Sequence, residues 1–302
     1  MVAITYPLSP APNVPSPAQV RAGIDAGVLK ATSQSGVHPT YVVNDGLTEL
    51  FFKDYTVRGE PMTILAERMA FAGAHESAVL FYREPLSWMR IQPYERASRE
   101  ARTLRQWRSM GIDAPVVLGY DETGLVLESI QGGTLLEKVA DATLEQAHIE
   151  RLANALHTAR ESALYIKDPS YFHSDPKLTN AIVSEDDRVY LIDPGMITKD
   201  LPVEELDAAF SLSYLIGLEG ILRDAPDHER ARVAAVTQAL ADAYLEGIGS
   251  QTRERMLAYA RPVSGRHISR MRRIPSAAFR RFARWLSYGD TEAIDHITFR
   301  IR

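Results

Sequence analysis

The sequence predicts an α+β protein, with a small antiparallel sheet near its N-terminus and a mostly helical C-terminal part. Runs of β-branched and aromatic residues concentrate before Ser129, whereas apolar residues at helical spacing dominate after Gly132-Gly133. Strands and helices that segregate along the chain are typical of α+β folds rather than of alternating folds with a parallel sheet. We therefore expect two lobes joined near the glycine pair.

Length and composition agree with a folded protein of this size. The 302 residues allow about two domains or lobes. The hydrophobic share of 45% and the charged share of 24% exclude a disordered chain or a fibrous repeat. A net charge of -5 gives no global attraction to nucleic acid or to an anionic membrane. The absence of Cys excludes disulfides and thiolate metal sites, and leaves His, carboxylate and amide groups as metal ligands.

The N-terminal stretch from Met1 to Pro17 holds five prolines and lacks a basic region followed by an apolar core. We interpret it as a loose arm rather than as a signal or anchor. The longest apolar run, from Ala208 to Leu222, falls short of the roughly 20 residues that span a bilayer. We expect no transmembrane segment and a cytoplasmic location.

The first elements follow this arm. A helix is predicted over Pro17 to Leu29, and residues 1–36 together form the arm and this N-terminal helix. Strands are predicted at Thr40 to Val43 and at Glu49 to Lys53. Asn44-Asp45-Gly46 between them indicates a hairpin, because these residues tolerate the positive φ of tight turns.

The remaining elements divide the chain into its two lobes. Residues 61–94 read as a helical insert broken near its prolines, Pro85 and Pro93, and a second helix runs from Arg96 to Met110. Two further strands are predicted at Pro115 to Gly119 and Leu125 to Glu128. We assign residues 37–131 to the N-lobe, with its insert, and 132–302 to the helical C-lobe, which keeps a short strand pair around 182–183 and 189–192.

The stretch from Tyr171 to Ile197 carries the residues suited to chemistry. Transfer of the γ-phosphoryl group of ATP needs a carboxylate that orients the attacking hydroxyl, a cation beside the phosphoryl oxygens and oxygen ligands for Mg²⁺. The stretch supplies each group, with two short strands before its last carboxylate: His173, Asp175, Lys177, Asn180 and Asp193. A single Asp-Pro-Gly is a common turn sequence, but turn formation does not explain all five of these residues together with the strands between them.

This pattern resembles the protein-kinase-like superfamily, whose catalytic loop reads H-x-D-x-K-x-x-N and whose metal-binding turn reads D-F-G. The resemblance implies a two-lobed kinase-like fold, with ATP and Mg²⁺ as cofactors and Mn²⁺ as a possible substitute. It makes Asp175 the catalytic base and places Lys177 beside the γ-phosphate. Asn180 and Asp193 would hold the metal.

The same resemblance assigns the nucleotide-binding residues of the N-lobe. Lys53 is the only lysine between Lys30 and Lys138, and would contact the ATP phosphates. Glu100, on the 96–110 helix, would pair with it. Glu67 competes because it is nearer to Lys53 in sequence, but the helix that carries Glu100 leads directly into the next strand, as the corresponding kinase helix does.

Adenine would lie at the hinge between the lobes. The resemblance gives this role to backbone groups of Glu128, Ser129 and Ile130, which end the last predicted N-lobe strand. The Glu128 side chain itself is equally consistent with an exposed strand end.

The sequence departs from the protein-kinase pattern at several positions, and these differences indicate which kind of kinase it resembles. No G-x-G-x-x-G loop is present, and only Ser33 to Gly36 offers backbone N–H groups before the hairpin. Pro194 replaces the Phe of D-F-G, and Ser174 replaces an Arg that receives a regulatory phosphate in many protein kinases. Only a few residues separate Gly195 from the next helix. These features are similar to the atypical small kinases: RIO-like proteins, the kinase of the KEOPS complex and lipopolysaccharide-core sugar kinases.

Two histidines and one aspartate near the site have alternative readings. We expect His157 and His173 to be packed structural residues rather than proton carriers. Asp207 either braces the catalytic loop, as a helix aspartate does in this superfamily, or only favours the start of its own helix.

The region from Arg261 to Arg284 is rich in arginine with interleaved aromatic residues. It could bind an anionic partner, namely RNA, a phosphorylated glycan or a membrane surface, or it could be an ordinary solvated face.

The combined hypothesis is an ATP- and Mg²⁺-dependent phosphotransferase acting on a hydroxyl group. Lys177 favours a protein Ser or Thr as the acceptor, whereas the short segment after Gly195 favours a sugar or another small molecule. Two alternatives remain: a pseudokinase that acts as a binding module, and an ATPase that works in a partner complex.

Overall fold

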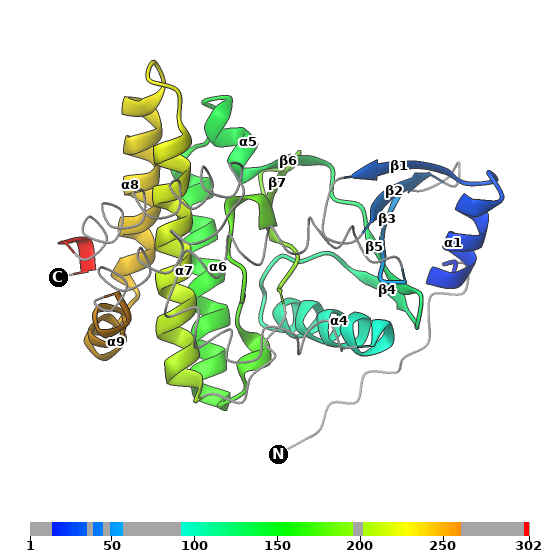
Figure 1. The fold of residues 1–302 in the computed structure, drawn as a ribbon, viewed down its shortest axis with the longest axis horizontal. Helices are drawn as coiled ribbons and strands as arrows, with labels where there is room; N and C mark the ends of the chain where they lie inside the picture. The colour runs from blue at the N-terminus through cyan, green and yellow to red at the C-terminus, as the bar shows by residue number, and fades with distance from the viewer. Residues whose placement is uncertain are drawn as a thin grey trace, which may run out of the picture.

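A computed structural model describes residues 14–34, 39–44, 49–56, 92–195, 202–260 and 299–301. It has a small lobe built on an antiparallel sheet and a larger helical lobe beside it (Figure 1). The two-lobed α+β class is therefore confirmed. No helix within these ranges is both long enough and apolar enough to cross a bilayer.

The small lobe contains a five-stranded sheet in the order β1-β2-β3-β5-β4, with every neighbouring pair antiparallel. Its strands are β1 (Lys30–Gln34), β2 (Thr40–Asn44), β3 (Glu49–Asp54), β4 (Val117–Tyr120) and β5 (Gly124–Glu128). Four of these follow the predicted runs. Strand β1 was missed: its polar sequence KATSQ lacks the alternation that marks a half-buried strand, and it forms at the sheet edge by pairing with β2.

The two faces of this sheet pack against different helices. Helix α1 (Pro17–Asp25), which begins at a Ser16 capping box, belongs to one face, where its Val20 joins a cluster with Phe52 and Val126. Helix α4 (Pro93–Ser109) covers the other face, and its fully buried Trp107 belongs to the main core. Strand β3 thus lies between the two helices, and its side chains alternate between them.

The structure corrects the start of α4. We expected Pro93 to break a helix, but it occupies the first turn of α4, where proline's missing N–H costs nothing. The predicted insert over residues 61–94 falls almost wholly outside the described residues.

The larger lobe combines a small sheet with packed helices. The sheet has the order β6-β7-β8, formed by β6 (Gly132–Thr134), β7 (Ala181–Ser184) and β8 (Val189–Leu191). The helices are α5 (Leu135–Ala140), α6 (Gln146–Ile166), α7 (Val203–Asp224), α8 (Arg230–Glu246) and α9 (Ser250–Ala260), with short 3-10 turns η2 (Pro169–Tyr171) and η3 (Leu178–Asn180).

Gly132 and Gly133, which we expected only to interrupt the chain, form the start of strand β6. Gly132 has φ +152°, and a Cβ atom there would collide with the backbone of Val183 on β7. Glycine allows the chain that leaves the small lobe to pair at once with the strand beyond the catalytic loop.

Hydrogen bonds from α4 and the loop after it join the two lobes. Trp107 Nε1 donates to the carbonyl of Tyr171 at 2.8 Å, and the Thr103 hydroxyl donates to that of Ser170 at 3.0 Å. The Leu191 N–H donates to the carbonyl of Asp113 at 2.8 Å. Helix α4 is thus anchored to the segment before Asp175, and the loop after α4 is anchored to the strand before Asp193.

Of the two readings of Asp207, the described part of the chain does not show the brace on the predicted catalytic loop. Within the described residues, its buried carboxylate accepts two hydrogen bonds from Arg160, at 2.6 and 2.9 Å, and one from Thr252 at 2.8 Å. These contacts join α6, α7 and α9. A buried guanidinium needs a paired anion, and Asp207 provides it.

Replacing Asp207 with Asn should lower the free energy of unfolding by about 3–5 kcal/mol, because the change leaves Arg160 buried without its counter-charge. Urea denaturation of the variant measures this loss. Glu204→Gln is the matched control: Glu204 lies on the same helix but pairs with a largely exposed Lys167, and the variant should lose less than about 1 kcal/mol. Equal losses in the two variants would contradict this account.

Candidate active site

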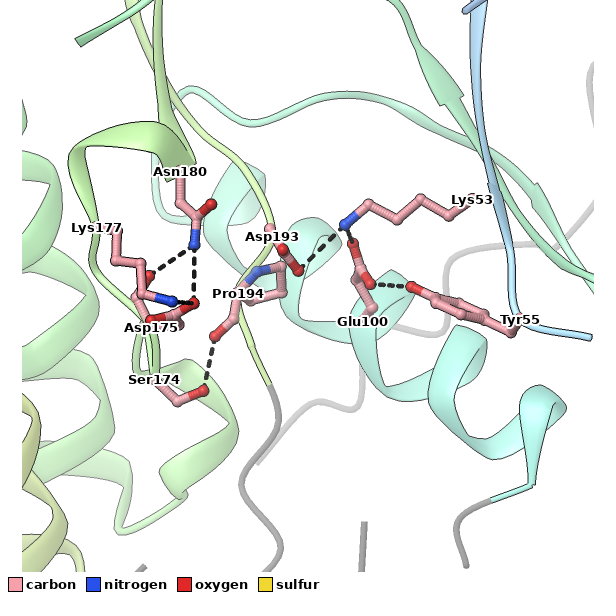
Figure 2. A network of polar contacts seen from close by, with 9 residues as sticks. All are labelled: Lys53, Tyr55, Glu100, Ser174, Asp175, Lys177, Asn180, Asp193 and Pro194. Atoms are coloured by element: carbon pink, nitrogen blue, oxygen red, sulfur yellow. Dashed lines mark hydrogen bonds and ion pairs between the residues drawn. The ribbon is translucent and has the colours of Figure 1, made fainter. Parts of the chain in front are cut away.

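A buried lysine lies at the centre of the candidate site. Lys53, near the end of β3, donates a hydrogen bond from Nζ to Oε1 of Glu100 on α4, with a distance of 2.7 Å. The same Nζ lies 3.2 Å from Oδ1 of Asp193. Figure 2 shows this side chain extending across to the two carboxylates, which come from separate segments of the chain. The ion pair with Glu100 is the contact that the sequence predicted.

Lys53 and its two carboxylates stabilise one another in their charged forms. Burial disfavours the ammonium of Lys53, but Asp193 and Glu100 outweigh it, and the pKa of Lys53 is raised. The charge of Lys53 in turn lowers the pKa of Asp193. Lys53 and Glu100 are almost fully covered, whereas the Asp193 side chain is 49% exposed. Asp193 therefore presents its carboxylate towards solvent while keeping its bond to Lys53.

Sequence reasoning missed Tyr55, which completes this cluster. Its hydroxyl donates a hydrogen bond to Oε2 of Glu100, so both carboxylate oxygens of Glu100 have a donor (Figure 2). The strand period offered a signal: residues two apart on a strand project from the same face, so Lys53 and Tyr55 should share a face.

The predicted catalytic loop forms a compact turn with Asp175 at its centre. Lys177 Nζ donates to Oδ2 of Asp175 at 2.9 Å. Asn180 Nδ2 donates to the same oxygen at 3.2 Å and to the backbone carbonyl of Asp175 at 2.9 Å. Oδ1 of Asp175 accepts no hydrogen bond from any described residue. That oxygen is therefore available to accept a proton.

The segment Asp193-Pro194-Gly195 lies against this loop. Asp193 has φ +48°, a left-handed conformation that is rare for residues other than glycine and concentrates at functional sites. Ser174, which stands where many protein kinases have Arg, donates from its N–H at 2.8 Å and from its hydroxyl at 2.9 Å to the carbonyl of Pro194. A Cβ atom at Gly195, whose φ is +72°, would collide with that hydroxyl. Ser174 thus fixes the position of the turn that carries Asp193.

The donor chemistry of this region fits a magnesium ion. Because the amide nitrogen of Asn180 donates to Asp175, its amide oxygen is left for another partner. Asp193 adds a half-exposed carboxylate. Magnesium is commonly held by one or two protein oxygens together with phosphate and water, so two residues suffice. Among the described residues no group of three or more His, Asp or Glu side chains could form a metal cage.

Only part of the segment predicted to bind adenine has backbone groups without a hydrogen-bond partner among the described residues. The N–H of Glu128 donates to the carbonyl of Val116, and its carboxylate accepts from the N–H of Val116, so neither group can contact adenine. Within the described part of the chain, no hydrogen bond occupies the backbone groups of Ser129 or Ile130. The Ser129 hydroxyl and the Gln131 amide both donate to Glu49, at 2.8 and 2.6 Å, which fixes the hinge against β3.

His173 is a packed residue, as expected. It is 5% exposed, and its ring centroid lies 5.1 Å from that of Trp107. Burial lowers the pKa of His173 to about 4, so the ring is neutral at pH 7. His157 is likewise packed: its ring stacks on Tyr244 at 5.3 Å, and its Nε2 lies 3.3 Å from the carbonyl of Ala243.

Other predicted features fall wholly or partly outside the described residues. These are Glu67, the Ser35-Gly36 end of the candidate phosphate loop, the segment 196–201 and the arginine-rich region Arg261 to Arg284. Ser33 and Gln34 belong to strand β1.

No protein-family model matches this chain, and no curated protein is significantly similar to it. Solved structures of the Mycobacterium tuberculosis PknI kinase domain are similar at low identity. A single mutant is 16% identical over 78% of this chain and 94% of that chain, with a TM-score of 0.39. A double mutant is 16% identical over 87% of this chain and 94% of that chain, with a TM-score of 0.40. The functional case rests on the contacts of the site itself.

Replacing His173 with Phe should make the free energy of unfolding less dependent on pH between about 4 and 6.5. In this range the unfolded chain binds a proton that folded His173 does not, so acid favours unfolding. The contribution of His173 is complete above pH 6.5 and is lost as the pH falls towards 4. It should add at most roughly 1.4 kcal/mol per pH unit.

Urea denaturation at pH 4.5, 5.5 and 7.5 measures this slope. His228→Asn is the control, because His228 has a side chain that is 79% exposed, and its pH profile should match the unmodified protein. Parallel profiles for all three proteins would contradict the buried, neutral state of His173.

Proposed function

We propose that this protein is an ATP- and Mg²⁺-dependent phosphotransferase of the atypical kinase type, which transfers the γ-phosphoryl group of ATP to a hydroxyl acceptor. The observation that carries the proposal is the Lys53 cluster. A buried lysine contacts Glu100 from α4 and Asp193 from the turn after β8, and a catalytic-loop aspartate lies close by. A folding role alone would not require a half-exposed carboxylate beside a buried ammonium.

Lys53, Glu100, Asp193 and the nearby Asn180 each suit one requirement of phosphoryl transfer. Lys53 offers a fixed positive charge to phosphate oxygens, and Glu100 holds that charge in place. Asn180 and Asp193 would hold Mg²⁺, which would neutralise the charge on the phosphate oxygens. Residues outside the cluster, at Ser129 and Ile130, offer free backbone groups for adenine at the hinge.

The acceptor hydroxyl would meet Asp175. The free Oδ1 of Asp175 would orient the hydroxyl and accept its proton as the new oxygen–phosphorus bond forms and the bond to ADP breaks. Lys177, held 2.9 Å from Asp175, would stand beside the transferring phosphoryl group and balance its charge. Lys177 is 49% exposed, so it lies within reach of solvent-borne ligands.

The atypical subtype rests on the chain's departures from the kinase pattern. Ser174 has a neutral side chain and so offers no cation to a regulatory phosphate, and both of its donors hold Pro194. This favours constitutive activity over control by phosphorylation. A protein Ser or Thr remains the favoured acceptor, with a sugar or other small molecule as the alternative. An ATPase acting with a partner complex would use the same residues.

Replacing Asp175 with Asn should slow phosphoryl transfer by about 10²–10⁴-fold, the usual contribution of a general base. The assay follows radiolabelled γ-phosphate from Mg²⁺·ATP into three pools: the protein itself, dephosphorylated casein and a panel of sugars. Asp242→Asn is the control, because Asp242 is exposed on α8 and its amide variant should keep full activity.

The destination of the label separates the readings. Label on a protein or a sugar supports the kinase and identifies the acceptor class. Label that appears only as free phosphate, and that is lost in Asp175→Asn, favours the ATPase. Absence of any ATP consumption by the unmodified protein would contradict catalytic activity.

A further inference from the structure

Tyr55 is the one member of the Lys53 cluster to which the phosphotransferase reading assigns no role. It lies directly after β3, is 6% exposed and donates its hydroxyl hydrogen to Oε2 of Glu100. Lys53 donates to the other oxygen, Oε1. Within the described residues these are the two partners of Glu100. A carboxylate held through both oxygens cannot rotate away from the lysine without losing a buried hydrogen bond.

Neighbouring contacts hold the Tyr55 side chain and backbone in place. The Tyr55 N–H donates to the carbonyl of Thr123 at 3.0 Å, which continues the sheet by one residue beyond β3. The guanidinium of Arg96, on α4, lies 5.5 Å from the centre of the Tyr55 ring. Tyr55 therefore contacts α4 at two places, one turn apart: through its ring at Arg96 and through its hydroxyl at Glu100.

The residue between Lys53 and Tyr55 fixes the strand from its other face. Asp54 is fully buried and forms an ion pair with Arg21 of α1. Its Oδ1 accepts hydrogen bonds from the N–H of Thr56 at 2.8 Å and from the Thr56 hydroxyl at 2.6 Å. The end of β3 is thus held by α1 on one face, while the side chains of Lys53 and Tyr55 face α4 on the other. This rigid strand end is a suitable support for Glu100.

We propose that Tyr55 is a positioning residue, which holds Glu100 and with it helix α4 in the arrangement that keeps Lys53 beside Asp193. The proposal rests on the proposed function for its catalytic meaning, but the positioning itself is a property of the ligand-free protein. The hydroxyl stays a donor over the working pH range, because burial and the charge of Glu100 raise the pKa of Tyr55.

The test compares Tyr55→Phe with Tyr41→Phe. Both variants remove one hydroxyl and keep the ring. Tyr41 lies on β2, and its ring stacks with Phe52 at 6.0 Å on the α1 face of the sheet, away from Glu100. In ligand-free protein, amide hydrogen exchange over residues 96–107 should be at least about fivefold faster in Tyr55→Phe, because Glu100 of α4 loses one of its two hydrogen bonds to the end of β3 and the residue after it. Tyr41→Phe should leave the exchange of this helix unchanged.

Ligand affinity provides the second readout. Tyr55→Phe should raise the Kd for Mg²⁺·ATP by about tenfold, since Glu100, then held by Lys53 alone among the described residues, no longer fixes the position of the lysine. The Kd for adenosine, which carries no phosphate, should stay the same. A residue that only stabilises the fold would weaken both ligands together or neither. In a Glu100→Gln background, the added effect of Tyr55→Phe on exchange should shrink, because the two changes act on one contact.

The outcomes distinguish this proposal from the function on which it rests. Unchanged α4 exchange in Tyr55→Phe, or equally faster exchange in both lobes, overturns the positioning role whatever the protein binds. Faster exchange confined to α4, in a protein that does not bind Mg²⁺·ATP at all, supports the positioning role and contradicts the proposed function.

Discussion

The candidate site depends on one constraint: a buried ammonium must be neutralised where water is excluded. Lys53 meets this constraint with Glu100 at 2.7 Å and Asp193 at 3.2 Å. Because these carboxylates belong to α4 and to the turn after β8, the sheet, the helix and the turn must come together for the charge to be tolerated. The same requirement explains why α4 is anchored through Trp107 and Thr103 to the segment before the catalytic loop. The contacts that neutralise Lys53 and the contacts that join the two lobes therefore depend on the same helix, α4.

The catalytic loop is linked to this network through backbone rather than through further charges. Ser174 binds the carbonyl of Pro194 with two donors, so the loop that carries Asp175 and the turn that carries Asp193 are held against each other. A proline at this place removes the aromatic side chain that the D-F-G pattern would supply. The left-handed conformation of Asp193 and the small Gly195 allow the close approach. These contacts hold the site in one arrangement. A serine at position 174, in place of a phosphate-binding arginine, agrees with a site that needs no phosphorylation to assume it.

The strands were predicted from strong local signals, whereas the pairing of Lys53 with Glu100 was predicted from the resemblance to the kinase-like superfamily. Continuous runs of β-branched, aromatic and other apolar residues marked β2, β3 and β5, and Lys53 had no competing lysine nearby. Strand β1 could not be predicted from its own polar residues, since its partner β2 supplies the reason for its conformation. The ion pair of Asp207 could not be predicted for a related reason: Arg160 lies 47 residues away, and only tertiary packing brings it to that carboxylate. Tyr55 was missed because its partner, Glu100, lies 45 residues away in sequence.

The central claim is that Lys53, Glu100 and Asp193 form a nucleotide and metal site. Thermal unfolding with ATP, in the presence and absence of Mg²⁺, tests it most directly, because a ligand that binds only the folded state raises the Tm. The account predicts a Mg²⁺-dependent rise for the unmodified protein that disappears in Asp193→Asn. An unchanged Tm for the unmodified protein at millimolar ATP and Mg²⁺, or an equal rise in both proteins, would contradict it.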